Sequence, residues 1–403
     1  MGMGCSSCFG LRVQSQDHFL SDYDQSDDEG GEYDDCERTD MTNGSYGELQ
    51  SPTKRSEQII LFRIQTGKVC RETPVKETHL VVRSEDDNGN KMVKEYVREF
   101  KIGSGSYAKV VLYRSSIDGK RYAIKAFHKS YLLKQQVAPS ETAMSDVLRE
   151  VLIMKMLDHP NIVSLIEVMD DPNTDHFYMV LEYVEGKWAP EGSGASGGLE
   201  ETTVRKYLRD IVAGLIYLHA HNVVHGDIKP DNLLVTGSGV VKIADFSVSQ
   251  VFEDENDELR RSPGTPVFTA PECWSGVTYH GKAADTWALG VTLYYMVFGK
   301  YPFTGDTMLE TYDEIVNNPM IIPGEINSQL KNLLEGILCK VSDIPYPKNN
   351  SVLCFISVSN LLFFEFLSYS RSTISINFEC YCGTSLGSWR RRAYPSTCMP
   401  LQA

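Results

Sequence analysis

The sequence predicts an α+β protein of two lobes, with a small β-rich lobe followed by a larger helical lobe. Short strand-like segments separated by turn signals fill residues 96–181, and long apolar helical segments dominate residues 185–340. Strands followed by a run of helices are typical of this fold class. With 403 residues, of which 42 % are hydrophobic, the chain is long enough to bury a sizeable core.

Residues 1–58 form an acidic leader that we expect to be disordered. From Asp17 to Asp40 there are eleven Asp and Glu and one Arg, so this segment carries most of the net charge of −15. Such a composition cannot bury enough apolar surface to become ordered. The negative charge argues against nucleic acid as a partner, because nucleic-acid binding requires clustered Lys and Arg.

The first eight residues, MGMGCSSC, offer a lipidation signal. Gly2 followed by Ser6 fits the pattern for N-myristoylation, and Cys5 and Cys8 are candidate palmitoylation sites that would supply the second anchor. The alternative is an unmodified leader. Ten scattered Cys without a secretory signal peptide indicate reduced intracellular thiols. We therefore expect a cytoplasmic protein that also enters the nucleus, with association to a membrane through the acylated N-terminus as the alternative.

Residues 59–95 are interpreted as an extension that leads into the ordered domain. They contain the β-prone patches IILFRI and HLVVR and the turn signal DDNGN. The domain itself is expected to span residues 96–340.

The domain opens with a glycine-rich strand–turn–strand, IGSGSYAKVVLY. Gly103 and Gly105 allow backbone amides to approach phosphates, since no Cβ obstructs them. Val110 is expected to cover a purine, and Ala123, on the following strand RYAIKAF, to line the same pocket. Two glycines occur in many turns, whereas Lys125 on the strand RYAIKAF is specific to a nucleotide site if a carboxylate partner holds it.

Glu150 is the candidate partner of Lys125. It lies 25 residues further on, in a segment whose apolar residues repeat at helical spacing and end before Pro160. An exposed ion pair would be worth only about 0 to 1 kcal/mol. We favour a pair that orients Lys125 toward the α and β phosphates of a nucleotide. The connector Leu181–Val184 is then the hinge between the lobes, with its backbone groups facing adenine.

The loop HGDIKPDN carries the groups needed for phosphoryl transfer. Asp227 is the candidate base for a hydroxyl proton, Lys229 the cation at the transferred phosphate, and Asn232 an amide ligand for Mg²⁺. Asp245, at a strand end 18 residues after Asp227, is the second candidate Mg²⁺ ligand. The alternative is a polar turn whose Asp and Asn cap backbone groups. Asp285, at the start of an apolar helix, is expected to hold the backbone of this loop.

Together these motifs resemble the eukaryotic serine/threonine protein kinases from Tyr96 to about Lys340. The resemblance implies a two-lobed protein kinase fold that uses ATP and Mg²⁺. It also implies a phosphorylatable regulatory Ser262, a substrate-loop Thr265 that with Lys229 is typical of serine/threonine specificity, and an Ala270–Glu272 segment that closes the activation loop. The implied nucleotide-binding residues are Ile102, Gly103, Ser104, Gly105, Ser106, Tyr107, Ala108, Lys109, Val110, Ala123, Lys125, Glu150, Glu182 and Val184.

The stretches HGDIKPDN, DFSVSQVF, RRSPGTPVFTAPE and VLREVLIMKMLDHPNIV resemble one plant family more closely. These are the kinases that bind the geminivirus Rep protein and activate sucrose-non-fermenting-related kinases, and they are similar to the calcium/calmodulin-dependent protein kinase kinases. The resemblance implies an upstream kinase that phosphorylates the activation-loop Thr of a downstream protein kinase. It further implies a viral replication protein as a partner and gives no oligomeric state.

Three positions depart from the kinase pattern. Ala108 replaces the third glycine of the loop, and Ser247 replaces the Gly after Asp-Phe and should stiffen the chain beside Asp245. Gly226 replaces the Arg before the catalytic Asp, so the usual clamp between that Arg and a phosphorylated loop cannot form. We therefore hypothesise basal activity without obligatory loop phosphorylation.

The resemblance ends abruptly at Lys340. Residues 341–403 are apolar and Ser-rich at first, without helix caps or a clear period, and we interpret them as a translated intron. The family pattern would continue with a turn whose Arg pairs with Glu272, and a closing helix, so the helical lobe is expected to be incomplete at its end. Two functions remain open, an active upstream kinase and a catalytically impaired kinase that acts as a partner-binding scaffold.

Overall fold

The computed structural model places the described residues in one compact unit. It describes residues 52–340 except 68–70, 72, 106, 139–140, 188–197, 254–255, 260–264, 275–277 and 325. The predictions for the lipidation signal, for most of the acidic leader, for Ser106 and Ser262, and for residues 341–403 lie outside this part of the chain.

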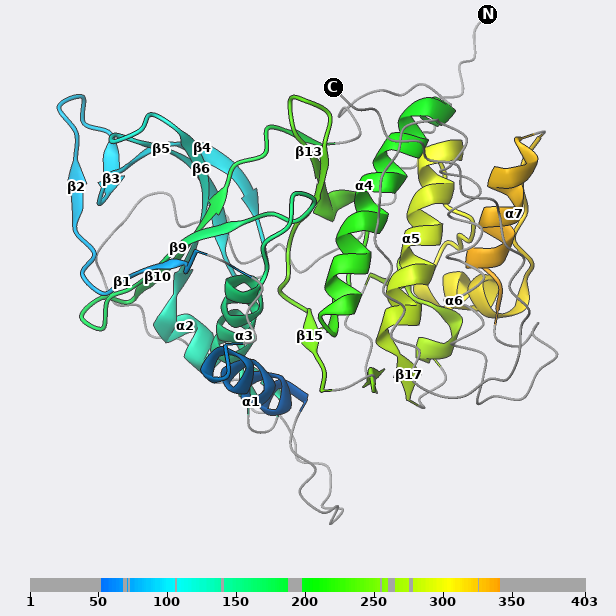
Figure 1. Ribbon diagram of the computed structural model, residues 1–403, viewed down its shortest axis with the longest axis horizontal. Helices are drawn as coiled ribbons and strands as arrows, with labels where there is room; N and C mark the ends of the chain where they lie inside the picture. Colours follow the sequence, from blue (N-terminus) through cyan, green and yellow to red (C-terminus); the bar gives the residue numbers. More distant parts are fainter. Residues whose placement is uncertain are drawn as a thin grey trace, which may run out of the picture. The chain divides into compact units, whose positions relative to one another are not determined.

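The N-terminal lobe is built on an eight-stranded sheet in the order β1-β9-β10-β6-β5-β4-β3-β2 (Figure 1). All neighbours are antiparallel except β1 and β9. The strands are β1 (Lys76–Thr78), β2 (Arg83–Glu85), β3 (Lys91–Val93), β4 (Tyr96–Ser104), β5 (Lys109–Ser115), β6 (Arg121–His128), β9 (Leu165–Asp170) and β10 (His176–Glu182).

The segment before Tyr96 adds strands to both edges of this sheet. β1 pairs with β9 at one edge, and β2 and β3 extend the other edge beyond β4. Between these edges, Val81 and Val93 pack with Tyr96 and Tyr178 in a core of their own. The extension therefore covers one face of the sheet.

A buried carboxylate fastens the extension to the sheet. The Glu167 side chain on β9 has no exposed surface, and it accepts hydrogen bonds from Lys76 (3.0 Å), Lys94 (3.0 Å) and the hydroxyl of Tyr96 (2.8 Å). A buried charge is tolerated only when it is paired and hydrogen-bonded. Glu167 therefore fixes three separate segments at one point.

The interpretation of IILFRI as a β-prone patch is wrong. Residues Pro52–Gln65 form helix α1, which also takes in the end of the expected disordered leader. Ile59 and Ile60 are 3 % and 0 % exposed in the main core. A short apolar run fits a strand or a buried helix equally well, and here the tertiary packing decides in favour of the helix.

The predicted helix around Glu150 is confirmed as α3 (Ala143–Met156). It lies against β9 and the short helix α2 (Lys129–Lys134), and a two-stranded pair, β7 (Gln136–Ala138) and β8 (Glu141–Thr142), precedes it. Its side chains at 147, 150, 151 and 154 share one stripe. This stripe places Glu150 among buried residues rather than in solvent.

The C-terminal lobe is helical, as predicted. Helix α5, the predicted apolar helix, is buried along most of its length and ends at Gly299, whose φ of 67° gives a left-handed cap. The helices are α4 (Glu201–Ala220), α5 (Gly281–Phe298), α6 (Met308–Asn317) and α7 (Ser328–Ile337), with 3-10 turns η2 (Pro230–Asn232), η3 (Pro266–Phe268) and η4 (Pro271–Trp274). Short strands form three further groups in this lobe. The first is β11 (Gly186–Lys187), which precedes α4, with β13 (Leu233–Val235) and β14 (Val241–Ile243). The others, between α4 and α5, are β12 (Val223–Val224) with β15 (Gln250–Val251), and β16 (Glu258–Leu259) with β17 (Tyr279–His280).

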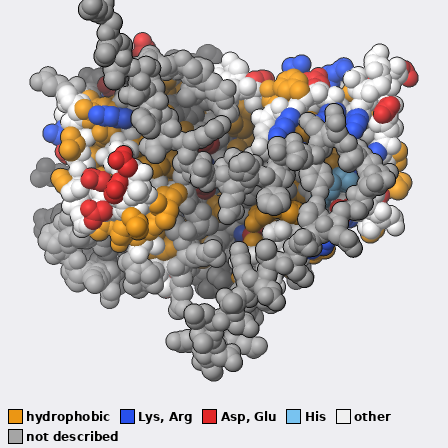
Figure 2. Space-filling model, turned by 180° about the vertical axis from the view of Figure 1, so that it is seen from behind, with side chains coloured by type: hydrophobic (Ala, Val, Ile, Leu, Met, Phe, Trp, Pro, Cys, Tyr) orange, Lys and Arg blue, Asp and Glu red, His pale blue; other side chains and the backbone are white. Residues whose placement is uncertain are grey.

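Charge is dispersed on the face of the molecule shown in Figure 2. Basic side chains of the described residues lie there in several separate places, between acidic and apolar side chains. Within the described ranges, no helix combines the length and the apolar character needed to cross a membrane.

Candidate active site

The catalytic loop is held by Asp285 at the start of α5. The carboxylate accepts hydrogen bonds from the backbone N–H groups of His225 (2.9 Å) and Gly226 (2.8 Å), and it lies 2.9 Å from Nε2 of His219. Its side chain is only 1 % exposed. Hydrogen bonds to a buried charged group are among the strongest in proteins. The prediction that Asp285 holds the loop backbone is confirmed.

Gly226 occupies a backbone position that suits glycine. Its φ is 81°, in the left-handed region, and a Cβ there would lie 3.3 Å from the carbonyl oxygen of Val248. A side chain would add backbone strain and a close contact. Glycine in place of the usual Arg thus removes the phosphate clamp and also lets the loop adopt its shape without strain.

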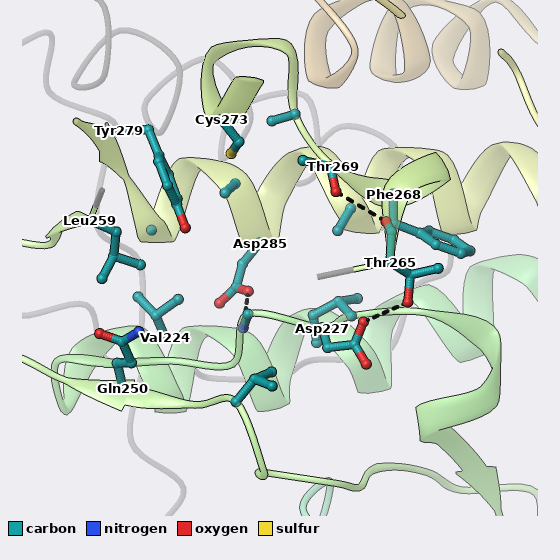
Figure 3. Close-up of a pocket in the computed structure, with 17 residues that line it drawn as sticks. Val224, Asp227, Gln250, Leu259, Thr265, Phe268, Thr269, Cys273, Tyr279 and Asp285 are labelled. Atoms are coloured by element: carbon teal, nitrogen blue, oxygen red, sulfur yellow. Dashed lines mark hydrogen bonds between the residues drawn. The ribbon is translucent and has the colours of Figure 1, made fainter. Parts of the chain in front are cut away.

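Four predicted residues converge beside this loop. Asp227 accepts a hydrogen bond from the Thr265 hydroxyl (3.0 Å) at one carboxylate oxygen, and its other oxygen lies 2.8 Å from Nζ of Lys229. Lys229 also donates to the Thr265 hydroxyl (2.9 Å), and Nδ2 of Asn232 donates to Asp227 (3.0 Å). The candidate base, the candidate cation and a threonine hydroxyl therefore meet within hydrogen-bond distance. Figure 3 shows the contact between Asp227 and Thr265.

His225, to which the sequence analysis gave no role, joins the catalytic loop to the segment around Asp245. Its Nδ1 accepts from the backbone N–H of Asp227 (3.2 Å), so Nε2 carries the proton that is donated to the carbonyl of Ala244 (3.1 Å). The ring also packs edge-on against Phe246 at 5.0 Å. The buried imidazole thus connects the backbone at Asp227 with the backbone just before Asp245.

Lys125 and Glu150 form the predicted ion pair. Nζ of Lys125 lies 2.7 Å from Glu150 and 3.0 Å from Asp245, and the Glu150 side chain is 2 % exposed. Burial by itself would lower the pKa of Lys125, but the charges of Glu150 and Asp245 outweigh it and raise this pKa. Lys125 is therefore a permanent cation between two anions that come from different lobes.

Asp245 presents its carboxylate to Lys125 from a left-handed backbone conformation. Its φ is 65°, and the next residue, Phe246, is fully buried while the Asp245 side chain is 41 % exposed. Burial opposes ionisation, but the charge of Lys125 and its hydrogen bond to Asp245 (3.0 Å) lower the pKa of Asp245 below its ordinary value.

The glycine-rich turn between β4 and β5 is closed by a hydrogen bond from the N–H of Gly105 to the carbonyl of Ala108 (2.8 Å). Gly103 pairs with Val110, which in turn pairs with Lys125 on β6. A Cβ on Gly105 would meet no atom within 4 Å. Packing inside the protein does not require this glycine, which is consistent with a backbone left open to a ligand.

The other predicted nucleotide residues fall on the same strands. Ile102 and Ser104 lie on β4 and Lys109 on β5, while Tyr107 and Ala108 pack against the main core. Ala123 on β6 lies opposite Leu181 on β10, next to the hinge. The structure therefore places these predicted residues on neighbouring strands of one sheet, in the turn between β4 and β5 and beside the hinge.

Glu182 uses its side chain differently from what a nucleotide contact would require. The carboxylate accepts from the N–H of Ser164 (2.7 Å) and pairs with Lys242 on β14 (2.8 Å), and the Glu182 N–H donates to the carbonyl of Ser164 (3.0 Å). Glu182 can then offer adenine only its backbone carbonyl, because its N–H and its carboxylate are already engaged. Lys242, to which no sequence motif points, ties the hinge to the C-terminal lobe.

Asn232 and Asp245 fit a divalent metal that arrives with a nucleotide. Nδ2 of Asn232 donates both of its hydrogen bonds to Asp227. This orients the side chain so that Oδ1 of Asn232 is the atom available to a metal ion. Among the described residues, no three or more His, Cys, Asp or Glu form a metal-holding cluster. A cation that takes few protein carboxylates and completes its shell with phosphate oxygens suits such a sparse set.

A small cavity of about 30 Å³ lies between the catalytic loop and residues 265–273 (Figure 3). Asp227, Thr265, Thr269 and Cys273 are among its lining residues, and Thr269 donates to the carbonyl of Thr265 (3.1 Å). A volume of this size holds about one water molecule. The loop that carries Thr265 is therefore packed closely onto the catalytic loop.

The two lobes and the converging Lys125, Asp227 and Asp245 define the class of the protein. The protein kinase domain family matches residues 96–343, and the chain belongs to the protein kinase family. Membership implies ATP and a divalent metal as cofactors.

The chain is a serine/threonine kinase similar to two plant enzymes. It is 70 % identical over 292 residues to serine/threonine-protein kinase GRIK2 of Arabidopsis thaliana, which covers 72 % of each chain. It is 62 % identical over 342 residues to serine/threonine-protein kinase GRIK1 of the same plant, covering 84 % of this chain and 86 % of the relative. Identity is 40 % over 260 residues to the calcium/calmodulin-dependent protein kinase kinase of Caenorhabditis elegans, covering 59 % of this chain and 48 % of the relative. The family resemblance drawn from the sequence is confirmed.

Proposed function

We propose that this kinase is an upstream kinase that uses ATP and Mg²⁺ to phosphorylate a Thr in the activation loop of another protein kinase. The single observation that supports it most is the position of Thr265. Its hydroxyl is 3.0 Å from Asp227 and 2.9 Å from Lys229, so the site accommodates a threonine hydroxyl presented by a kinase activation loop. One relative is itself named a protein kinase kinase.

The chemistry follows from which groups face the hydroxyl. Asp227 orients the substrate hydroxyl and accepts its proton, while Lys229 faces the transferred phosphoryl group. Lys125, fixed by Glu150, holds the α and β phosphates. Mg²⁺ bound through Asn232 and Asp245 would neutralise charge on the β and γ phosphates. Catalysis here is mainly positioning and electrostatic stabilisation.

The proposal is tested by phosphate transfer from labelled ATP to a peptide that carries the activation-loop Thr of an energy-sensing kinase. Transfer to the Thr peptide and none to the matched Thr→Ala peptide is the expected result. The Asp227→Asn chain is the enzyme control. Transfer to a generic basic peptide but not to the loop peptide would contradict the upstream role while leaving the kinase activity in place.

We do not propose the scaffold alternative. Lys125, Asp227 and Asp245 are all present with the contacts that phosphoryl transfer requires. Phosphate transfer at a rate no greater than that of the Asp227→Asn chain would reinstate it.

We also propose a cytoplasmic and nuclear kinase; the alternative is association with a membrane through lipidation of Gly2 and of Cys5 or Cys8. Binding of a viral replication protein stays a prediction from family resemblance. Fractionation of the wild-type chain and of Gly2→Ala tests the lipid anchor, since loss of acylation should release membrane-bound protein. Unchanged membrane association would end the idea.

A further inference from the structure

Helix α1 lies outside the family match and yet packs against the helix that carries Glu150. Ile59 and Ile60 belong to the same core as Val147 and Val151 of α3. α1 packs against α3 in the N-terminal lobe and against β15 in the C-terminal lobe (Figure 1). It therefore links the two lobes on the side of α3.

The polar contacts of α1 with the C-terminal lobe are specific. The Arg63 guanidinium donates to the carbonyl of His221 (2.7 Å) and to the carbonyl of Phe252 (2.8 Å). His221 is the C-cap of α4, where carbonyls lack intrahelical partners and the helix dipole favours a cation. The Ser56 hydroxyl adds a weaker contact to the carbonyl of Val251 (3.4 Å). One end of α1 is thus anchored by a planar fork of donors.

The helix that α1 supports is buried on more than one side. Its buried residues include Glu150 and Val151 on one stripe and Ile153 and Met156 on another. A helix on a lobe surface would bury a single stripe. Neighbours on both sides therefore fix the rotation of α3, and this rotation decides whether Glu150 reaches Lys125.

The catalytic loop lacks the usual means of coupling this helix to activation. Gly226 stands where an Arg would bind a phosphorylated loop, so a phosphate at that loop has no such partner in the catalytic loop. The polar contacts of α1 with the C-terminal lobe go to backbone carbonyls, which are acceptors that need no phosphate. We propose that α1 is a built-in positioning helix, and that Arg63 holds α3 so that Glu150 stays paired with Lys125 without loop phosphorylation.

The test compares Arg63→Ala and Arg63→Lys with a control on the same helix, Leu61→Ala, in the full chain. Leu61 is 48 % exposed and makes no contact used in the proposal. In Arg63→Ala, kcat/KM for ATP should fall by about tenfold, which is typical of coupling between a support and a site. Arg63→Lys, which keeps the charge and loses the fork, should fall between Arg63→Ala and the wild type, and Leu61→Ala should match the wild type. Circular dichroism at the assay temperature corrects each rate for the folded fraction.

The decisive readout is the same Arg63→Ala change in a Glu150→Gln background. If α1 acts through Glu150, the second change should alter kcat/KM by less than about twofold, because the pair it supports is already lost. Amide hydrogen exchange of residues 143–156 should also be faster in Arg63→Ala and unchanged in Leu61→Ala. An equal loss in both backgrounds, or unchanged exchange in α3, would overturn the proposal. Loss of wild-type activity after phosphatase treatment would overturn its claim of independence from phosphorylation.

Discussion

The catalytic loop and the Lys125 ion pair are held in different ways. The loop around Asp227 is fixed by contacts inside one lobe, above all the two backbone hydrogen bonds to Asp285. The pair of Lys125 and Glu150 is in contact with further segments. Asp245 of the C-terminal lobe binds Lys125, and α1 packs against α3, which carries Glu150. The proton-accepting group is thus built into the larger lobe, whereas the nucleotide-orienting group depends on how the lobes meet.

This difference indicates where stability and activity are separable. Replacing Asp227 should greatly lower activity and leave stability unchanged. Replacing Asp285 should lower both activity and stability. Changes near Lys125 should act mainly on ATP.

Asp227→Asn should lower turnover by about 10² to 10⁴, because the base that accepts the hydroxyl proton is lost while its hydrogen-bond partners remain. Single-turnover phosphate transfer measures the rate, and thermal unfolding measures stability. An unchanged rate would remove Asp227 from the mechanism.

Asp285→Ala should lower turnover by about 10²-fold and also destabilise the fold by about 2 to 5 kcal/mol. Two buried N–H donors would lose their acceptor, and the loop would shift. Asp285→Asn, which keeps one acceptor oxygen, is the matched control and should lose less. Denaturant unfolding and steady-state kinetics of the same variants measure the two losses together. A loss of turnover without a loss of stability would show that the hydrogen bonds to Asp285 do not stabilise the fold.

Glu150→Gln should lower kcat/KM for ATP by about 10- to 100-fold, since a charge-assisted contact to Lys125 worth about 1.5 to 3 kcal/mol is lost. The denaturation midpoint should change much less than in Asp285→Ala. Kinetics at varied ATP concentration separate KM from kcat. If kcat/KM for ATP were unchanged, Lys125 would not depend on its partner in α3.

Glu272→Gln should slightly raise stability at neutral pH and flatten its dependence on pH. Burial raises the pKa of Glu272, so the folded protein binds this proton more tightly than the unfolded chain does. Stability from this group therefore rises as the pH falls from neutral through the raised pKa toward the ordinary glutamate value of about 4.3. Asp245 behaves oppositely, because its lowered pKa gives stability that is lost only in acid. Thermal unfolding between neutral and mildly acidic pH checks the sign, and a steeper slope in the variant would contradict it.

The sequence was sufficient for the residues that meet at the site. Asp227, Lys229 and Asn232 lie within one short loop, and their spacing is a local property that covalent geometry preserves. The same holds for Gly103 and Gly105 in a strand–turn–strand. Such patterns predicted the two-lobed fold and the Lys125–Glu150 pair, because a strand and a helix that follow in order have few ways to pack.

What the sequence alone determined was therefore the set of reacting groups and the order of the elements. Tertiary structure alone decided that IILFRI is a helix, that the Glu182 carboxylate pairs with Lys242 and that Arg63 reaches two carbonyls more than 150 residues away. A short apolar run has no preferred period, and a surface-type Arg or Glu has no local partner. Their roles are fixed only when burial and hydrogen bonding are satisfied across distant segments.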